Sequence, residues 1–270
     1  MEYARIASYP AAGVVYGMFE EKPSLFPFSF VVARSDAGIV LCDCGFMNEG
    51  RSAELIRKFG VDSWVSPVAL LGEIGISRND VTAVFISHAH YDHMGSIAQF
   101  PGAHIYLQKQ ELLSWIEALA LPPRYGFLTE AIDPASIVSA IASSVEHRLT
   151  LLEGDADDVL PGIHVRLVPG HTMGHQIILL DSAVGRYAVS GDCIYSMRNL
   201  TGEGCDHQHR RYMPLGNGVG SVWDQLKSFD RLEAAVAGDL DRIIILHDQR
   251  RWPNFEKIKE VDGHGIYRVA

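Results

Sequence analysis

An apolar strand that runs directly into a cluster of histidines constrains this chain more than any other feature. Residues 81–93 read Val-Thr-Ala-Val-Phe-Ile-Ser-His-Ala-His-Tyr-Asp-His, and the first six have the β-branched and aromatic character of a strand. His88 and His90 can point the same way from an extended loop, whereas Asp92 and His93 lie on the next turn and can face a second point. Such a spacing suits two metal ions better than one.

Three further loops repeat the pattern of a potential ligand placed just after an apolar strand. They supply His171, Asp192 and His247. Open α/β sheets commonly build their sites at the carboxyl ends of strands, so these side chains are expected to meet the first cluster. Each histidine alone would more often be a surface residue or a hydrogen-bonded core residue, but together they predict a metal centre.

Short apolar runs separated by turn residues alternate with helical patterns along the whole chain. Because several strands are apolar on both faces, helices are expected to cover them, which predicts a layered α/β body with two sheets inside. The expected strands are 28–32, 38–42, 81–86, 103–107, 163–168, 176–180, 186–190 and 242–246, and the expected helices are 51–59, 108–119, 133–143 and 222–237.

No low-complexity linker divides the chain, so residues 1–270 are predicted to form a single domain. A lid or insertion is predicted around residues 120–144, because this stretch contains the run Pro-Pro-Arg-Tyr-Gly at 122–126.

The excess of acidic residues narrows the class of substrate. Asp and Glu number 33 against 23 Lys and Arg, a formal net charge of -10. This balance disfavours nucleic acid and anionic membranes and favours a small-molecule substrate. The first residues lack a basic stretch followed by an apolar core, and no apolar run reaches the roughly 18 residues of a membrane span, so a cytoplasmic protein is expected. No feature identifies a partner protein, and a homodimer is left open.

The four cysteines, Cys42, Cys44, Cys193 and Cys205, do not suggest a disulfide framework, and reduced thiols are expected. Cys42 and Cys44 are two apart in an apolar segment, so in a strand they would share a face. Burial is the expected fate of this pair rather than metal ligation.

The histidine cluster resembles the HxHxDH motif of the metallo-β-lactamase superfamily, and the later family ligands map onto the histidines and the aspartate of the other loops. This resemblance implies a four-layer αββα sandwich that holds two divalent metal ions. The ligands of the first ion would be His88, His90 and His171. The ligands of the second ion would be Asp92, His93 and His247, with Asp192 bridging the two ions.

Other residues fit the family pattern in part. Asp43 matches the supporting aspartate of the first family motif, whereas Cys44 replaces the common threonine and Met173 replaces the usual proline of a later motif. His175 is expected beside the ligands rather than among them. The donors accept zinc, manganese, cobalt or iron, and zinc is the expected metal.

Within the superfamily the chain is most similar to the N-acyl homoserine lactonases, the enzymes of quorum quenching. In these a tyrosine three residues after the bridging aspartate contacts the substrate carbonyl, and Tyr195 has that spacing from Asp192. The expected reaction is therefore the opening of a lactone by a metal-held hydroxide. Asp92 is expected to act both as a ligand and as a proton shuttle.

Two other activities stay open. A thioester hydrolase of the glyoxalase II type would use the same metal centre, and a mono-iron dioxygenase would leave the second ligand group empty. A β-lactamase is disfavoured by Asp192 at the bridging position and by the expected lack of an export signal.

Several side chains have no assigned role. The pairs Arg210-Arg211 and Arg250-Arg251 either bind an anionic group of the substrate or form a solvated face. Cys205, His207 and His209 are expected in a pocket-lining or solvated loop. The aromatic residues that could line an apolar pocket, or simply pack in the core, are Phe26, Phe28, Trp115, Tyr125 and Phe127.

Overall fold

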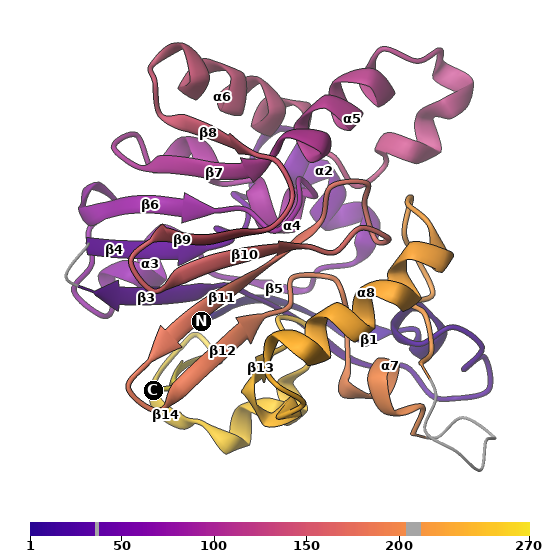
Figure 1. Cartoon of the computed structure of the whole chain (residues 1–270). Coiled ribbons are helices and arrows are strands. Elements are labelled where there is room, and N and C mark those ends of the chain that lie inside the picture. The colour runs from indigo at the N-terminus through magenta and orange to yellow at the C-terminus, as the bar shows by residue number, and fades with distance from the viewer. Residues whose placement is uncertain (36–37, 204–211) are drawn as a thin grey trace.

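The computed structural model describes residues 1–35, 38–203 and 212–270, and two stacked sheets form its centre (Figure 1). The first sheet has the strand order β3-β4-β6-β7-β8, and the second has the order β13-β12-β11-β10-β9. The strands of the first sheet are β3 (Val31–Ser35), β4 (Gly38–Cys42), β6 (Val81–Phe85), β7 (His104–Gln108) and β8 (Leu149–Leu152). The strands of the second are β9 (Ala156–Leu160), β10 (Ile163–Leu167), β11 (Gln176–Ser182), β12 (Gly185–Val189) and β13 (Ile243–Ile244).

Strand direction places the ends that matter for function. In the first sheet β4, β6, β7 and β8 run parallel to one another, and in the second β12 and β13 are parallel. The loops that contain the predicted histidine ligands follow the carboxyl ends of strands in these two sheets.

Smaller strands and the helices complete the chain. A third sheet joins β2 (Ser24–Ser29), β1 (Glu2–Tyr9) and β5 (Ser63–Trp64), and β14 (Glu256–Val261) pairs with β15 (His264–Arg268). The helices are α1 (Ala11–Val14), α2 (Gly50–Phe59), α3 (Pro67–Gly72), α4 (Tyr91–Met94), α5 (Lys109–Leu119), α6 (Pro134–Val145), α7 (Met197–Thr201) and α8 (Val222–Ala235). The 3-10 turns are η1 (Arg78–Asp80), η2 (Ile97–Gln99), η3 (Pro123–Thr129), η4 (Leu240–Arg242) and η5 (Gln249–Asn254).

Side chains alternate between the two faces of each strand, so they pack both into a core between the two sheets and into cores on their outer faces. In β4, Val40 and Cys42 face the core between the two sheets, whereas Leu41 packs on the other side among residues of the helices. In β11, Ile178 faces the core between the sheets and Ile177 packs on the far side.

Helices close both outer cores. On the first sheet the buried faces of α2, α5 and α6 contribute Leu55, Leu112 and Ile137. On the second sheet α8 contributes Phe229 and Leu232. The order helix, sheet, sheet, helix confirms the predicted four-layer αββα sandwich.

Most predicted elements match the structure, with displaced ends and some omissions. The expected strand at 28–32 is in fact the junction of β2 and β3, with the buried Phe30 between them. The strands β1, β14 and β15 were not predicted, because charged residues interrupt their apolar patterns. β1 and β15 each carry buried residues, whereas β14 is exposed along almost its whole length and is defined by its pairing with β15.

Residues 120–144 contain η3 and most of α6. The buried side chains of α6 pack into the first sheet's helix core, so this part belongs to an outer layer. The segment 123–127 is exposed throughout. The lid and the single domain stay predictions. Among the described residues, no helix is long and apolar enough to cross a bilayer.

The expected shared face of Cys42 and Cys44 is wrong, although both are buried as predicted. Cys42 ends β4 and lies in the core between the sheets, but Cys44 lies in the helix core. Asp43 between them has φ of 59°, a left-handed conformation that turns the chain after the strand.

Candidate metal centre

The loops after β6, β10, β12 and β13 bring all seven predicted ligands to one edge of the sheets. His88 and His90 precede α4, which carries Asp92 and His93, and the other three loops contribute one side chain each. Candidate ligand atoms fall into two groups, and within each group these atoms all lie within 4.8 Å of one another. The first group is His88, His90, His171 and Asp192, and the second is Asp92, His93, Asp192 and His247.

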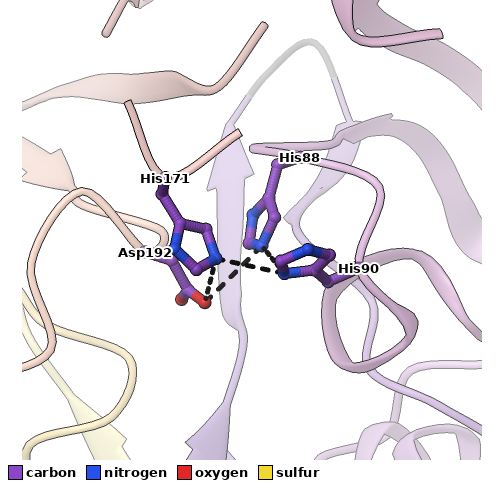
Figure 2. Close-up of side chains that lie close together, drawn as sticks. All are labelled: His88, His90, His171 and Asp192. Atoms are coloured by element: carbon purple, nitrogen blue, oxygen red, sulfur yellow. Dashed lines mark hydrogen bonds and ion pairs between the residues drawn. The ribbon is translucent and has the colours of Figure 1, made fainter. Parts of the chain in front are cut away.

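In the first group the side chains converge on a common point, as Figure 2 shows. Nδ1 of His90 lies 3.0 Å from Nε2 of His88 and 3.1 Å from Nε2 of His171. Oδ2 of Asp192 lies 3.2 Å from Nε2 of His171 and 3.5 Å from Nε2 of His88.

The second group uses the other oxygen of the shared aspartate. Oδ1 of Asp192 lies 3.0 Å from Nε2 of His93 and 2.9 Å from Nε2 of His247. Oδ2 of Asp92 lies 3.3 Å and 3.7 Å from the same two nitrogens. Asp192 therefore offers one oxygen to each group, which is the geometry of a bridging carboxylate.

The chemistry of these donors fits a pair of divalent cations. Among the described residues, the buried Oδ1 atom of Asp192 has no hydrogen-bond partner, which leaves it available as a ligand. Burial lowers the pKa of His90 to about 3 and lowers the pKa of His88 well below its usual range. Both rings are thus held in the neutral form that binds a metal. Imidazole and carboxylate donors are the ligands of zinc and similar cations.

His93 is oriented from behind by Asp43, as the family pattern implies. Burial opposes protonation of His93, but the carboxylates of Asp192, Asp92 and Asp43 outweigh it and raise the pKa of this ring. Oδ2 of Asp43 accepts a hydrogen bond from Nδ1 of His93 at 2.7 Å, and its two oxygens also accept from the backbone N–H and hydroxyl of Ser87. This leaves Nε2 of His93 directed at Asp192.

His175 lies beside the ligands. Its Nε2 atom accepts a hydrogen bond from the backbone N–H of Asp192 at 2.9 Å, and its ring centroid lies 5.0 Å from that of His88. Both contacts agree with the expected place of this residue next to the candidate ligands.

Aromatic side chains wall the centre. The ring of Tyr195 is 5% exposed and lies 5.8 Å from the ring of His171 and 5.2 Å from that of His247, so it touches both groups. Burial raises the pKa of Tyr195 well above its usual range, which keeps its hydroxyl protonated. Phe26 stacks on His247 with centroids 4.4 Å apart, and Tyr9 stacks on Phe26 at 4.3 Å.

Of the five aromatic residues expected at a pocket or in the core, Phe26 and two others lie beside the candidate ligands, and the remaining two are exposed. Phe28 and Trp115 lie against His247 and His90, with centroids 5.3 Å and 5.7 Å apart. Tyr125 and Phe127 of η3 are 43% and 72% exposed and so are not core residues. Tyr9 was not identified from the sequence, because its strand β1 was itself missed.

The described arginines near the centre have protein partners. Arg250 binds Asp248 through two nitrogens, at 2.8 Å each, and also contacts Ser196. Arg251 binds Asp241 and the carbonyl of Leu240. These contacts favour a structural role over binding of an anionic substrate. The predictions for Cys205, His207, His209, Arg210 and Arg211 lie outside the described residues.

Among known proteins, the N-acyl homoserine lactonase AttM of Azorhizobium caulinodans is 25% identical over 196 residues, covering 70% of this chain and 66% of that relative. An N-acyl homoserine lactonase of a Bacillus species is 29% identical over 180 residues, covering 63% of this chain and 65% of the relative. The chain thus matches slightly less than two thirds of the length of these relatives.

Solved structures show the same fold. A quorum-quenching N-acyl homoserine lactone lactonase superposes with a TM-score of 0.68 at 22% identity, covering 98% of each chain. The hydrolase AbOPH superposes with a TM-score of 0.69 at 19% identity, covering 99% of this chain and 91% of the other. The sequence profile of the metallo-beta-lactamase superfamily matches residues 24–247, most of the chain, and the chain therefore belongs to that superfamily.

Proposed function

We propose that this protein is a metal-dependent hydrolase that opens the ring of a lactone, with an N-acyl homoserine lactone as the expected substrate class. The observation that carries the proposal is the position of Tyr195, whose buried ring contacts both His171 and His247 and so lies over both ligand groups. The lactonase relatives and structural neighbours support the same class of substrate.

The first metal ion would be held by His88, His90 and His171, the second by Asp92, His93 and His247, and Asp192 would bridge them. When bound, two divalent cations, with zinc the expected identity, polarise an ester carbonyl and make hydroxide available at neutral pH. The presence of two complete ligand groups argues against a mono-iron dioxygenase.

The protein groups have distinct tasks. The protonated hydroxyl of Tyr195 donates a hydrogen bond to the substrate carbonyl or to the ring oxygen as negative charge develops there. Water adds to the carbonyl carbon, the ring C–O bond breaks, and a proton passes from the attacking water through the carboxylate of Asp92 to the leaving alkoxide. The products are a carboxylate and a hydroxyl on one open chain, and the second proton of the water is released to solvent.

The aromatic wall shapes the substrate side of the centre. Phe26 packs against both Tyr195 and His247, and Tyr9 covers Phe26 from the other side. Such apolar rings exclude water from the histidines and offer contact to an acyl chain or a lactone ring.

The test is acid release by the zinc-loaded protein on short- and long-chain N-acyl homoserine lactones, aromatic and carboxylated lactones, and thioesters, beside a chelator-treated sample. We expect lactone opening that the chelator abolishes. Cleavage of thioesters alone would identify a glyoxalase II type of hydrolase. Turnover that survives complete removal of metal would contradict the proposed mechanism.

A further inference from the structure

A fully buried carboxylate lies behind the first ligand group. Glu111 lies in the first turn of α5, a helix of the outer layer, and its side chain is 0% exposed. Burying a charged carboxylate is unfavourable unless hydrogen bonds satisfy it. Within the described residues its two oxygens accept four such bonds, so this side chain is completely engaged.

The donors come from the two loops that carry the histidines of the first group. Oε1 accepts from the backbone N–H of Ala89 at 2.9 Å, and Ala89 stands between His88 and His90. Oε2 accepts from the hydroxyl of Thr172 and from the backbone N–H of Gly174, both at 2.8 Å. Thr172 directly follows His171, so one carboxylate joins both histidine loops.

The fourth donor reaches the same group by another route. Nε1 of Trp115, one turn further along α5, donates to Oε1 of Glu111 at 2.7 Å. The indole ring of Trp115 in turn lies 5.7 Å from the ring of His90. Glu111 therefore fixes the backbone beside His88, His90 and His171 and also the aromatic surface on which His90 rests.

The close packing leaves little freedom for this arrangement. A Cβ atom added at Gly174 would meet the backbone nitrogen of Glu111 at 2.2 Å, so the loop lies directly on the start of α5. An amide at position 111 would turn one acceptor into a donor. In one orientation the NH2 group would face the N–H groups of Ala89 and Trp115, and in the other it would face the N–H of Gly174. At least one hydrogen bond would be lost in either case.

We propose that Glu111 is a positioning residue that sets the geometry of the His88, His90 and His171 group and leaves the group of Asp92, His93 and His247 largely unaffected. The inference rests on the proposed function, because it assumes that both groups hold metal. The inference goes beyond the proposed function, because it states that Glu111 positions the ligands of only one of the two metal ions.

The experiment is a titration of metal-free wild type and the Glu111→Gln variant with Co²⁺ against a chromophoric chelator, with thermal unfolding measured in parallel. We expect two sites in the wild type. In the variant one site should weaken about 10- to 100-fold while the other changes less than about threefold. The cobalt spectrum of the retained site should match that of His171→Ala and differ from that of His247→Ala.

Asp133 supplies a matched control. This carboxylate is 6% exposed and accepts hydrogen bonds from Ser52 and Ala135, so it joins α2 to α6 without touching either histidine loop. The Asp133→Asn variant should lose thermal stability as the Glu111 variant does, but should keep both metal affinities within about twofold.

Equal weakening of both sites, an unchanged pair of affinities, or equal effects in the Asp133 control would overturn the inference while leaving the proposed function intact. A wild type that binds no metal would overturn the proposed function itself. If Glu111→Gln does not fold, Thr172→Val removes a single donor from the same carboxylate. It should then weaken the same site several-fold, and an unaltered affinity would equally overturn the proposal.

Discussion

Nδ1 of His93 donates a hydrogen bond to Oδ2 of Asp43 at 2.7 Å, while Nε2 of the same ring lies 3.0 Å from Oδ1 of Asp192. The imidazole is thus held between two carboxylates. Asp43 orients the ring, and Asp192 belongs to the same candidate ligand group as His93. In metal sites such an outer carboxylate fixes the tautomer and raises the basicity of the ligand.

The Asp43→Asn variant should therefore bind the second metal ion about 10- to 100-fold more weakly, because an amide has one acceptor oxygen and its NH2 group would face either the backbone N–H of Ser87 or the ring of His93. Loss of a buried acceptor should also lower the free energy of unfolding by about 1–3 kcal/mol. Competition titration with zinc and urea unfolding measure the two effects. An Asn variant with wild-type affinity for both ions would show that this hydrogen bond does not orient the ring.

Asp92 lies 3.3 Å from His93 through Oδ2 and contributes to the second ligand group. If it also carries the proton to the leaving group, Asp92→Asn should reduce kcat on a lactone by on the order of 100-fold or more. Its metal content should fall by much less. Metal content is measured by elemental analysis on the sample used for kinetics. Equal losses of metal and turnover would leave Asp92 as a ligand only.

Tyr195→Phe keeps the ring between His171 and His247 and removes only the hydroxyl. We expect kcat to fall on the order of 100-fold, the usual cost of one donor to a developing oxyanion, with little change in KM or metal content. Tyr212→Phe is the matched control, because the hydroxyl of Tyr212 donates to Asp230 at 2.8 Å on α8. Unchanged kinetics in the Tyr195 variant would remove this residue from the mechanism.

The meeting of the seven candidate ligands could be predicted from the sequence, because the loops that carry them follow apolar strands and strand direction brings these loops to one edge. Asp43, which follows β4, could be identified only from its match to the first family motif. The role of Glu111 could not be predicted, because a lone glutamate in the first turn of a helix is exposed to solvent in most proteins. Its burial arises only when the loops of Ala89 and Gly174 fold onto α5 from distant parts of the chain.

Tyr9 could not be placed from the sequence, and the shared face expected for Cys42 and Cys44 is wrong, for related reasons. The packing of Tyr9 on Phe26 depends on the pairing of β1 with β2, which no local pattern indicates. The separation of Cys42 from Cys44 depends on the left-handed backbone of Asp43, whose side chain accepts three hydrogen bonds from Ser87 and His93.

The three buried thiols, Cys42, Cys44 and Cys193, should react slowly with thiol reagents in the native protein. Burial raises the pKa of Cys44 to about 12 and raises the pKa of Cys42 and Cys193 above the usual range of a thiol. A raised pKa keeps the thiol protonated, so at pH 8 only about one Cys44 in 10⁴ is a reactive thiolate. Native protein carrying Cys205→Ser should therefore react slowly with an aromatic disulfide reagent, and should release three equivalents only in denaturant.

Two of these thiols, Cys44 and Cys193, also lie next to the candidate metal centre, so the same experiment tests the rigidity of that centre. Sγ of Cys44 donates to the carbonyl of His93 at 3.3 Å, and Cys193 follows Asp192. Modification of either would displace a ligand, so turnover should persist through prolonged exposure of the native protein to the reagent and vanish only as the thiols react. Rapid modification of a native thiol with immediate loss of activity would mean that the loops carrying His93 and Asp192 open readily in solution.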